Sequence, residues 1–172
     1  MAAAWTSRRS SAVSVLRELL KAVARGLLGR YEINRIYGCD LAKPPGVPSS
    51  DYPMRRVVVD EVGGAEHGAI RNRASYGGPG AVGFGLWEHG KLTCLCWFWD
   101  STRYRDWKTW RIGEREAIMV DLLTVDGDRR RGLASALIAY AAAEMKRAGY
   151  ERLYAWVWHS NLPSIRTFER AG

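Results

Sequence analysis

Hydrophobic residues change their spacing along this chain, and the changes predict where helices and strands lie. Apolar residues recur at helical spacing between residues 11 and 28, with charged residues facing away from them, and this pattern predicts an amphipathic helix. The pattern from Ser135 to Ala148 predicts a second helix. Alternating, β-branched or continuous apolar runs predict strands at residues 31–37, 56–62, 82–87, 92–99, 118–125 and 151–158.

Turn-forming residues separate these runs. His89-Gly90 stands between two predicted strands and is typical of a hairpin turn. Residues 41–51 contain Pro44-Pro45-Gly46 and predict a loop. Residues 63–80 are rich in glycine and arginine and predict an irregular segment. So long a loop is usually a mobile lid, a binding loop or a mis-assigned element.

Length and composition favour a folded domain that resides in a reducing compartment. A chain of 172 residues with 47% hydrophobic residues can bury a sizeable core. It contains no apolar run of about eighteen residues, which a membrane-spanning helix requires. Cys39, Cys94 and Cys96 provide neither a disulfide framework nor metal-ligand spacing. We therefore expect no metal site, buried inert thiols at Cys94 and Cys96, and a cytoplasmic location.

Positive charge is concentrated at the start of the chain. Residues 1–30 hold six basic residues and one acidic residue, a net charge of +5, so the rest carries only +3 of the total +8. We expect this basic helix to cover the sheet or a neighbouring subunit. A membrane-surface anchor and a mitochondrial transit peptide are the two other interpretations.

Basic residues also alternate with aromatic ones in residues 101–113. Tyr104, Trp107 and Trp110 stand there among arginines, a pattern that suits stacking on nucleic-acid bases but equally suits packing at a sheet edge. The modest charge of this part of the chain does not require a nucleic-acid surface. A nucleic-acid partner is therefore not expected.

A glycine-containing loop follows the apolar run at 118–125. It reads Arg129-Arg130-Arg131-Gly132-Leu133-Ala134 and leads directly into the helical pattern. Small residues let consecutive N–H groups at the helix start point outward, and with the helix dipole they form an anion site. The neighbouring arginines add charge suited to phosphate.

Two motifs in this order make residues 114–172 resemble the GNAT superfamily of N-acetyltransferases. The family motif [Gln/Arg]-x-x-Gly-x-[Gly/Ala] is matched by Arg129, Gly132 and Ala134. A second family signature begins with Val, continues through Asn and a small residue, and ends in an aromatic and Gly. It is matched at Val157, Asn161, Ser164, Phe168 and Gly172.

The resemblance implies a fold and a reaction. We expect an α/β domain of the α+β type, with a mixed, mostly antiparallel sheet flanked by helices. The expected reaction is transfer of an acetyl group from acetyl-CoA, or another acyl group from its acyl-CoA, to a primary amine by direct attack. The identity of that amine-bearing acceptor is left open. The alternative is a catalytically idle acyl-CoA-binding or interaction domain.

The resemblance also implies a site where the family's fourth and fifth strands part. The donor's pantetheine arm is expected to bond the fourth strand as an added strand would, with its pyrophosphate on the arginine-rich loop. The residues expected to contact it are Leu122, Leu123, Thr124, Val125, Arg129, Arg130, Arg131, Gly132, Leu133, Ala134, Ser135, Asn161, Ser164 and Phe168.

The sequence leaves more than one choice for the residues that transfer protons. One register of the fourth strand places Glu116 on the face of Leu122 and Thr124, whereas the other places Asp121 with Leu123 and Val125; a bulge would exchange the two. The general base is therefore Glu116, Asp121 or a water. Many family members protonate the leaving thiolate with a tyrosine where this chain has Phe168. His159 is the nearest alternative acid, and solvent is another.

The chain departs from the family once more after the second motif, because family members continue with a further aromatic and two strands. We therefore expect a carboxyl-terminal end that is truncated and a sheet without its final strands. The fifth strand at 151–158 should then be an exposed edge, covered by a homodimer partner or by the amino-terminal helix. The expected domains are a basic helix at 1–30 and a GNAT-like domain at 31–172.

Overall fold

The computed structural model describes residues 33–46, 51–107 and 110–171, and all of them except Ile33 belong to the unit Asn34–Gly172. The amino-terminal helix predicted at 11–28 lies outside the described residues. No helix in the described part of the chain is long and apolar enough to cross a membrane.

A six-stranded sheet forms the centre of this unit. Its order is β1-β6-β5-β4-β3-β2, and every neighbouring pair is antiparallel except β5 and β6, which run parallel. The strands are β1 (Asn34–Asp40), β2 (Met54–Val57), β3 (Ala81–Glu88), β4 (Lys91–Asp100), β5 (Glu116–Thr124) and β6 (Arg152–Trp158). The predicted mixed, mostly antiparallel sheet is therefore confirmed.

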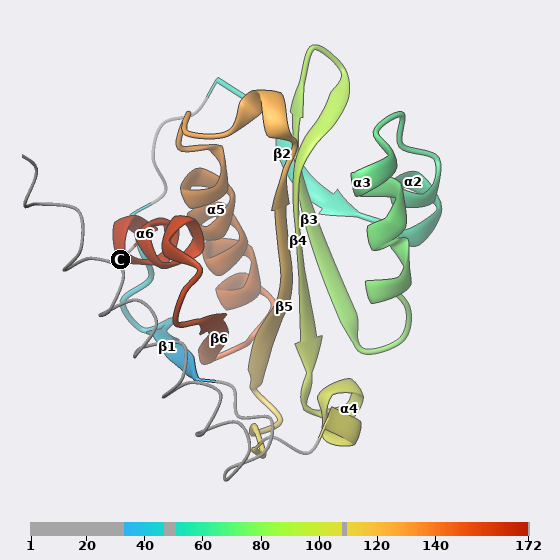
Figure 1. The fold of residues 1–172 in the computed structure, drawn as a ribbon. Coiled ribbons are helices and arrows are strands. Elements are labelled where there is room, and N and C mark those ends of the chain that lie inside the picture. Colours follow the sequence, from blue (N-terminus) through green and yellow to red (C-terminus); the bar gives the residue numbers. More distant parts are fainter. Residues whose placement is uncertain (1–32, 47–50, 108–109, 172) are drawn as a thin grey trace, which may run out of the picture. The chain divides into compact units, whose positions relative to one another are not determined.

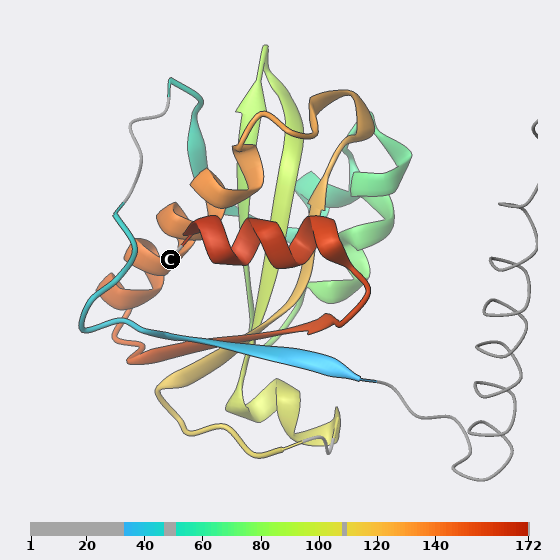
Figure 2. The same ribbon diagram turned by 60° about the vertical axis from the view of Figure 1, so that its left-hand side comes forward.

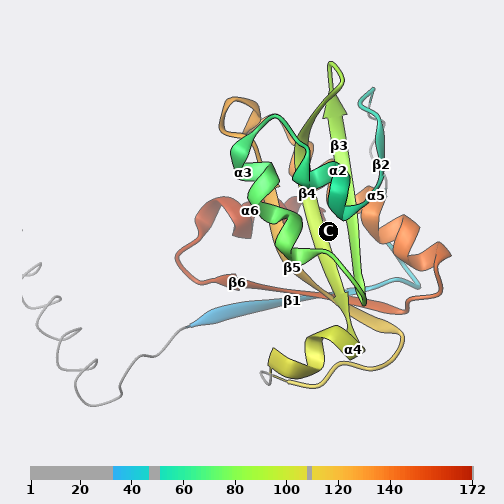
Figure 3. The same cartoon turned by 90° about the vertical axis from the view of Figure 1, so that its right-hand side faces the viewer.

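Helices cover both faces of the sheet (Figure 1). We call one the α5 face, where α5 (Leu133–Arg147) lies with α6 (Leu162–Ala171) packed against it. The opposite face, the α2 face, carries α2 (Val59–Gly63), α3 (Gly68–Arg71) and the 3-10 helix η1 (Asn72–Tyr76), as Figure 3 shows. Three further short elements are α4 (Ser101–Tyr104), η2 (Arg105–Trp107) and η3 (Asp126–Asp128).

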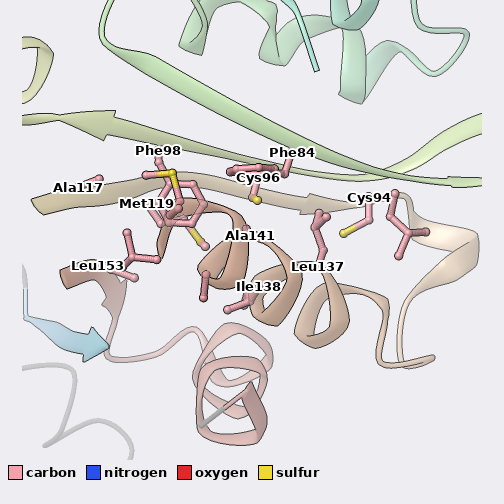
Figure 4. Close-up of a cluster of buried hydrophobic side chains, with 14 of the residues drawn as sticks. Phe84, Cys94, Cys96, Phe98, Ala117, Met119, Leu137, Ile138, Ala141 and Leu153 are labelled. Atoms are coloured by element: carbon pink, nitrogen blue, oxygen red, sulfur yellow. The ribbon is translucent and has the colours of Figure 1, made fainter. Parts of the chain in front are cut away.

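The largest core cluster lies between the sheet and α5. Figure 4 shows Phe98 and Met119 pointing from β4 and β5 toward the helix. Cys94 and Cys96 are fully buried in this cluster, which confirms the prediction for these thiols. Burial raises the pKa of Cys94 to about 11 and raises that of Cys96 as well, so both thiols remain protonated and unreactive.

Trp97 is the main core residue of the α2 face, where it is 2% exposed. It fits because its neighbour on β3 is Gly83: a Cβ at that position would lie 2.6 Å from the Trp97 ring. Gly83 therefore provides the space that a large ring needs in a close-packed sheet interface.

The hairpin predicted around His89-Gly90 is confirmed. β3 and β4 pair on either side of it, and both turn residues have positive φ, 50° for His89 and 77° for Gly90. Two consecutive positive φ values are the feature of the type I′ turn, whose twist matches that of the strands.

The strand predicted at 56–62 is wrong in its second half, because β2 ends at Val57 and α2 begins at Val59. β-branched residues favour a strand there, but Asp60 and Glu61 occupy the first turn of α2 and suit a helix N-terminus. Burial of Val62 in the core of the α2 face then stabilises the helical turn. Packing overrides local propensity here.

The irregular segment predicted at 63–80 is also wrong in part, because α3 and η1 lie within it. The His67 Nδ1 caps α3 by accepting a hydrogen bond from the Ala69 N–H at 3.2 Å. Ile70 is fully buried under the sheet. The segment is a set of short packed helices.

The prediction that the strand at 151–158 forms an exposed edge is wrong. β1 pairs antiparallel with β6 along its whole length, from Asn34 opposite Trp158 to Asp40 opposite Arg152. Figure 2 shows the two strands side by side. β1 of the same chain covers this edge of β6. Neither a partner subunit nor the amino-terminal helix is therefore required to cover it.

Candidate active site

β5 and β6 separate halfway along their length. Their parallel pairing covers only Glu116–Met119 opposite Arg152–Ala155, and we call the last pair, Met119 and Ala155, the fork. Beyond the fork, residues 120–124 continue in β5 without a β6 partner among the described residues. Their backbone N–H and C=O groups on that side form an edge to which an extended ligand can add.

A bulge in β5 lies directly beyond the fork. Trp97 and Phe98 are adjacent on β4, yet they pair with Asp121 and Met119, which leaves Val120 as the extra residue. The bulge reverses the side-chain alternation, so Met119 and Leu122 both face α5. It also means that Glu116 does not share the face of Leu122 and Thr124, and that interpretation of the sequence is wrong.

Asp121 lies on the α2 face, opposite Trp97. Its carboxylate approaches Arg73 of η1, with Asp121 Oδ1 at 3.2 Å from Arg73 Nε, and only 12% of its side chain is exposed. The second oxygen, Oδ2, is buried and has no hydrogen-bond partner among the residues that the structure describes. Burial raises the pKa of Asp121 to about 6, and the positive charge of Arg73 acts in the opposite direction.

Glu116 occupies a different environment, at the paired end of β5. Its Oε2 accepts a hydrogen bond from the Gly113 N–H at 2.8 Å, and its Oε1 accepts one from the Tyr154 hydroxyl at 3.2 Å. Arg152 lies 3.4 Å from the same oxygen. Through these partners, Glu116 links β5 to β6 and to the loop that precedes β5. It lies in the paired part of the two strands.

His159 follows the end of β6 and is exposed. The structure therefore places the three predicted proton-transfer residues apart. Glu116 lies at the start of β5, where the strand still pairs with β6. Asp121 lies two residues beyond the fork on β5, and His159 follows the end of β6.

The arginine-rich loop leads from η3 into α5. Gly132 is the N-cap of α5 with φ of 79°, a left-handed conformation that favours glycine, and Arg130 also has a positive φ of 67°. A Cβ on Gly132 would meet no atom of the described residues within 4 Å, so no neighbour crowds this position. The N–H groups of Leu133, Ala134 and Ser135 begin this helix and suit an anion.

Arg131 is held by three neighbours on one side of this loop. Its guanidinium forms two hydrogen bonds with Glu88 at 2.6 and 2.7 Å, contacts Asp128 at 2.9 Å and donates to the Tyr52 hydroxyl at 2.5 Å. The network ties the loop to the tip of the β3–β4 hairpin. Nothing in the sequence pattern pairs Arg131 with residues so distant along the chain.

The remaining predicted loop and strand residues divide between backbone and packing roles. Arg129 donates from Nε to the Thr124 carbonyl at 3.3 Å and pairs with Asp126 at 2.8 Å. The Val125 N–H donates to the Thr93 carbonyl at 2.9 Å. Leu122 packs on the α5 face and Leu123 on the α2 face. These contacts fix the path of β5 into the loop.

The residues of the second motif build the start and one face of α6. The Asn161 side-chain oxygen accepts a hydrogen bond from the Ser164 N–H at 3.3 Å, a typical helix cap. Ser135 donates from its hydroxyl to the Thr167 carbonyl at 3.2 Å and ties α5 to α6. Phe168 stacks on Tyr37 of β1, with ring centroids 5.2 Å apart.

Tyr104 and Trp110 of the 101–113 segment pack against each other, and Trp110 also packs against Tyr154 of β6. Tyr104 is 1% exposed. The Trp110 ring meets the Tyr104 ring edge-on, with centroids 5.7 Å apart, and meets the Tyr154 ring edge-on, with centroids 6.3 Å apart. Packing accounts for the positions of these two rings.

A model of the acetyltransferase (GNAT) family matches residues 79–172, more than half of the chain. The chain therefore belongs to the GNAT acetyltransferase family. No curated protein matches it in sequence.

Solved structures share the fold at low sequence identity. The ribosomal-protein-S18-alanine N-acetyltransferase of Escherichia coli is 18% identical, with 70% of this chain and 76% of that chain covered and a TM-score of 0.53. An aminoglycoside acetyltransferase from an uncultured soil metagenomic sample, in complex with sisomicin, is 10% identical over 70% and 86%, with a TM-score of 0.52. An IAA acetyltransferase of Bacillus cereus is 9% identical over 71% and 76%, with a TM-score of 0.52.

Arg73 is the residue of the site that sequence reasoning missed. It lies in the segment predicted to be irregular, and no motif or spacing distinguishes it from the neighbouring Arg71. Only the packing of η1 on the sheet brings it to Asp121.

Proposed function

We propose that this protein transfers an acetyl group from acetyl-CoA to a primary amine by direct attack. The observation that carries the proposal is the fork between β5 and β6. Among the described residues, it leaves 120–124 of β5 without a β6 partner, and β5 leads to the helix start at Gly132. An elongated donor with an amide-rich arm and a pyrophosphate matches these two features.

The donor would bind as an added strand. The backbone of residues 120–124 would bond its pantetheine arm, and the N–H groups at the start of α5 would hold its pyrophosphate. Arg130 is exposed on this loop and would add positive charge, whereas the Arg131 side chain is engaged by Glu88. A strand N–H directed at the thioester carbonyl would stabilise the charge that develops on its oxygen.

Asp121 is the base in this proposal. An amine attacks only when it is neutral, so its proton must leave. A carboxyl with a pKa of about 6 is mostly ionised at neutral pH and still accepts a proton readily. Asp121 lies beside the fork with one unpartnered oxygen, whereas the oxygens of Glu116 accept hydrogen bonds from Gly113 and Tyr154. The acceptor would approach from the α2 face.

The departing thiolate has no tyrosine to protonate it at position 168. Phe168 stacks on Tyr37 and contributes no proton. A thiolate is a tolerable leaving group near neutral pH, so solvent would protonate it.

Calorimetric titration of the 172-residue chain with acetyl-CoA tests donor binding. Saturable binding is expected, and Gly132→Glu should abolish it, because the new carboxylate repels the pyrophosphate and φ of 79° disfavours a side chain. Gly127→Glu is the matched control, since Gly127 is also open on this loop and has no positive φ. It should weaken binding only a few-fold. No binding by the unaltered chain would contradict the proposal.

An amine screen that follows release of free CoA thiol then separates an enzyme from an idle binding domain. The idle domain is the second candidate, and the absence of a hydroxyl at Phe168 is the observation that favours it. The solved structures named for S18-alanine and aminoglycoside acetylation indicate the amines to try first. Turnover with any of them that depends on Asp121 supports the enzyme.

A further inference from the structure

An apolar pocket lies on the α5 face next to the fork. Its cavity volume is about 100 Å³, and it is partly open to solvent. Its walls come from β1, β4, β5, β6, α5 and α6 and are almost entirely apolar. They include Met119, Ile138, Ala142, Leu153, Ala155 and Phe168. This volume is too small for a whole drug-sized ligand and suits a short hydrocarbon chain.

The pocket borders the proposed donor site at the fork. Met119 and Ala155 are the fork, the last residues that pair before β5 and β6 separate, and both line the pocket. A thioester that reached the fork along β5 would therefore lie next to two residues of the pocket wall. Figure 4 shows Met119 and Leu153 directed from the strands toward α5 on this side of the sheet.

Small side chains keep this space open. Ala142 of α5 and Ala155 of β6 face the pocket from opposite sides, where larger apolar residues would fill it. The Tyr37–Phe168 stack contributes another wall and ties β1 to α6. β1, which covers the edge of β6, is thus also part of the pocket.

We infer that this pocket binds the hydrocarbon part of an acyl donor longer than acetyl-CoA. The inference rests on the proposed function, because it assigns the chemical class of the donor for that same site. An acetyl group ends at the fork and leaves the apolar walls exposed to water. A straight acyl chain that continues past Met119 and Ala155 would bury its methylene groups against them, and each fully buried methylene strengthens binding about fourfold.

Titration of the 172-residue chain with acetyl-, butyryl-, hexanoyl- and octanoyl-CoA tests the inference. The dissociation constant should fall along the series, and hexanoyl-CoA should bind at least about tenfold more tightly than acetyl-CoA, allowing for incomplete burial. Ala142→Leu fills the pocket with a residue that favours helix. It should bring hexanoyl-CoA to within about threefold of acetyl-CoA and leave the affinity for acetyl-CoA unchanged.

Two further variants keep the test decisive. Ala143→Leu makes the same change on the adjacent residue of α5, which does not line the pocket, and it should retain the preference for long chains. If Ala142→Leu fails to fold, as judged by its thermal unfolding midpoint, Ala155→Val narrows the pocket from the strand side instead. Because Ala155 is also part of the fork, the readout for this variant is the ratio of the dissociation constants of hexanoyl-CoA and acetyl-CoA, which should approach one. β-branched valine suits a strand.

Each outcome bears on the inference. Equal binding of acetyl- and hexanoyl-CoA would overturn it and leave the proposed acetyl transfer in place. Loss of acetyl-CoA binding in Ala142→Leu but not in Ala143→Leu would also overturn it, because the pocket would then hold the body of the donor. Failure of every CoA ester to bind would overturn both the inference and the proposed function.

Discussion

The two carboxylates of β5, Glu116 at its start and Asp121 beyond the fork, lie in opposite circumstances. Glu116 lies where β5 and β6 pair, and a backbone N–H, a hydroxyl and an arginine surround it. Asp121 lies where the strands have separated, with one ion-pair partner and a buried oxygen that has none. Glu116 thus stabilises the fold through its partners, whereas Asp121 is a carboxyl group whose pKa is raised. A polar group that the fold leaves incompletely satisfied is the better candidate for chemistry.

Replacing each carboxylate by its neutral amide should reveal the largest difference between Glu116 and Asp121. Asp121→Asn should reduce kcat for amine acetylation by about a hundredfold to ten-thousandfold, the usual contribution of a general base. Glu116→Gln should retain kcat within a few-fold. Steady-state rates of CoA thiol release measure both. Equal losses in the two variants would show that Asp121 has no special role.

Stability should also separate the two environments. The pKa of Asp121 rises from 3.8 to about 6 on folding, so the folded state binds the extra proton and the free energy of unfolding falls as pH rises between about 4 and 6. This contribution amounts to about 1–3 kcal/mol. Asp121→Asn lacks it, and urea unfolding at pH 4 and pH 7 should show a smaller loss for the variant than for the unaltered chain.

The pH profile tests Arg73 as the partner of Asp121. In the unaltered chain, log kcat/KM should rise with pH through an apparent pKa near 6 as Asp121 loses its proton. Arg73→Met removes the charge that holds this pKa down, so the acidic limb should move to higher pH by about one unit. Arg71→Met is a control from the same segment and should leave the limb in place.

A tyrosine at position 168 is expected to have the smallest effect. Phe168→Tyr restores the hydroxyl that the resemblance leads one to expect, at a ring that already lines the space next to the fork. If protonation of the thiolate limits turnover in part, kcat should rise a few-fold at alkaline pH, where solvent protons are scarce. The pH dependence of kcat in the two proteins measures this, and an unchanged profile would assign the step to solvent alone.

The sequence predicts the local features of this site well. Gly132, Ala134 and the following helical pattern predict a turn and a helix start, because the constraint lies within a few consecutive residues. The hairpin at His89-Gly90 is predictable for the same reason. The sheet type and the position where two strands separate follow from the family resemblance.

Features that depend on distant residues could not be predicted. The bulge at Val120 could not be predicted because β5 has apolar residues on both faces. Apolar and polar residues therefore do not alternate along the strand, and no change of alternation marks the extra residue. The position of β1 beside β6 depends on pairing between opposite ends of the domain. Arg73 is identifiable only after η1 has packed on Trp97 and its neighbours. In each case tertiary contacts, and not propensity, decide the outcome.

The pairing of β1 with β6 has a consequence for the order of folding. These strands are more than one hundred residues apart along the chain, and β1 has no other strand partner in the described part. Contacts between distant residues carry a large entropic cost and form late. As the ribosome releases the chain, the segment at 34–40 must wait for 152–158 before it can join the sheet. Until then the apolar pocket beside the fork lacks one of its walls.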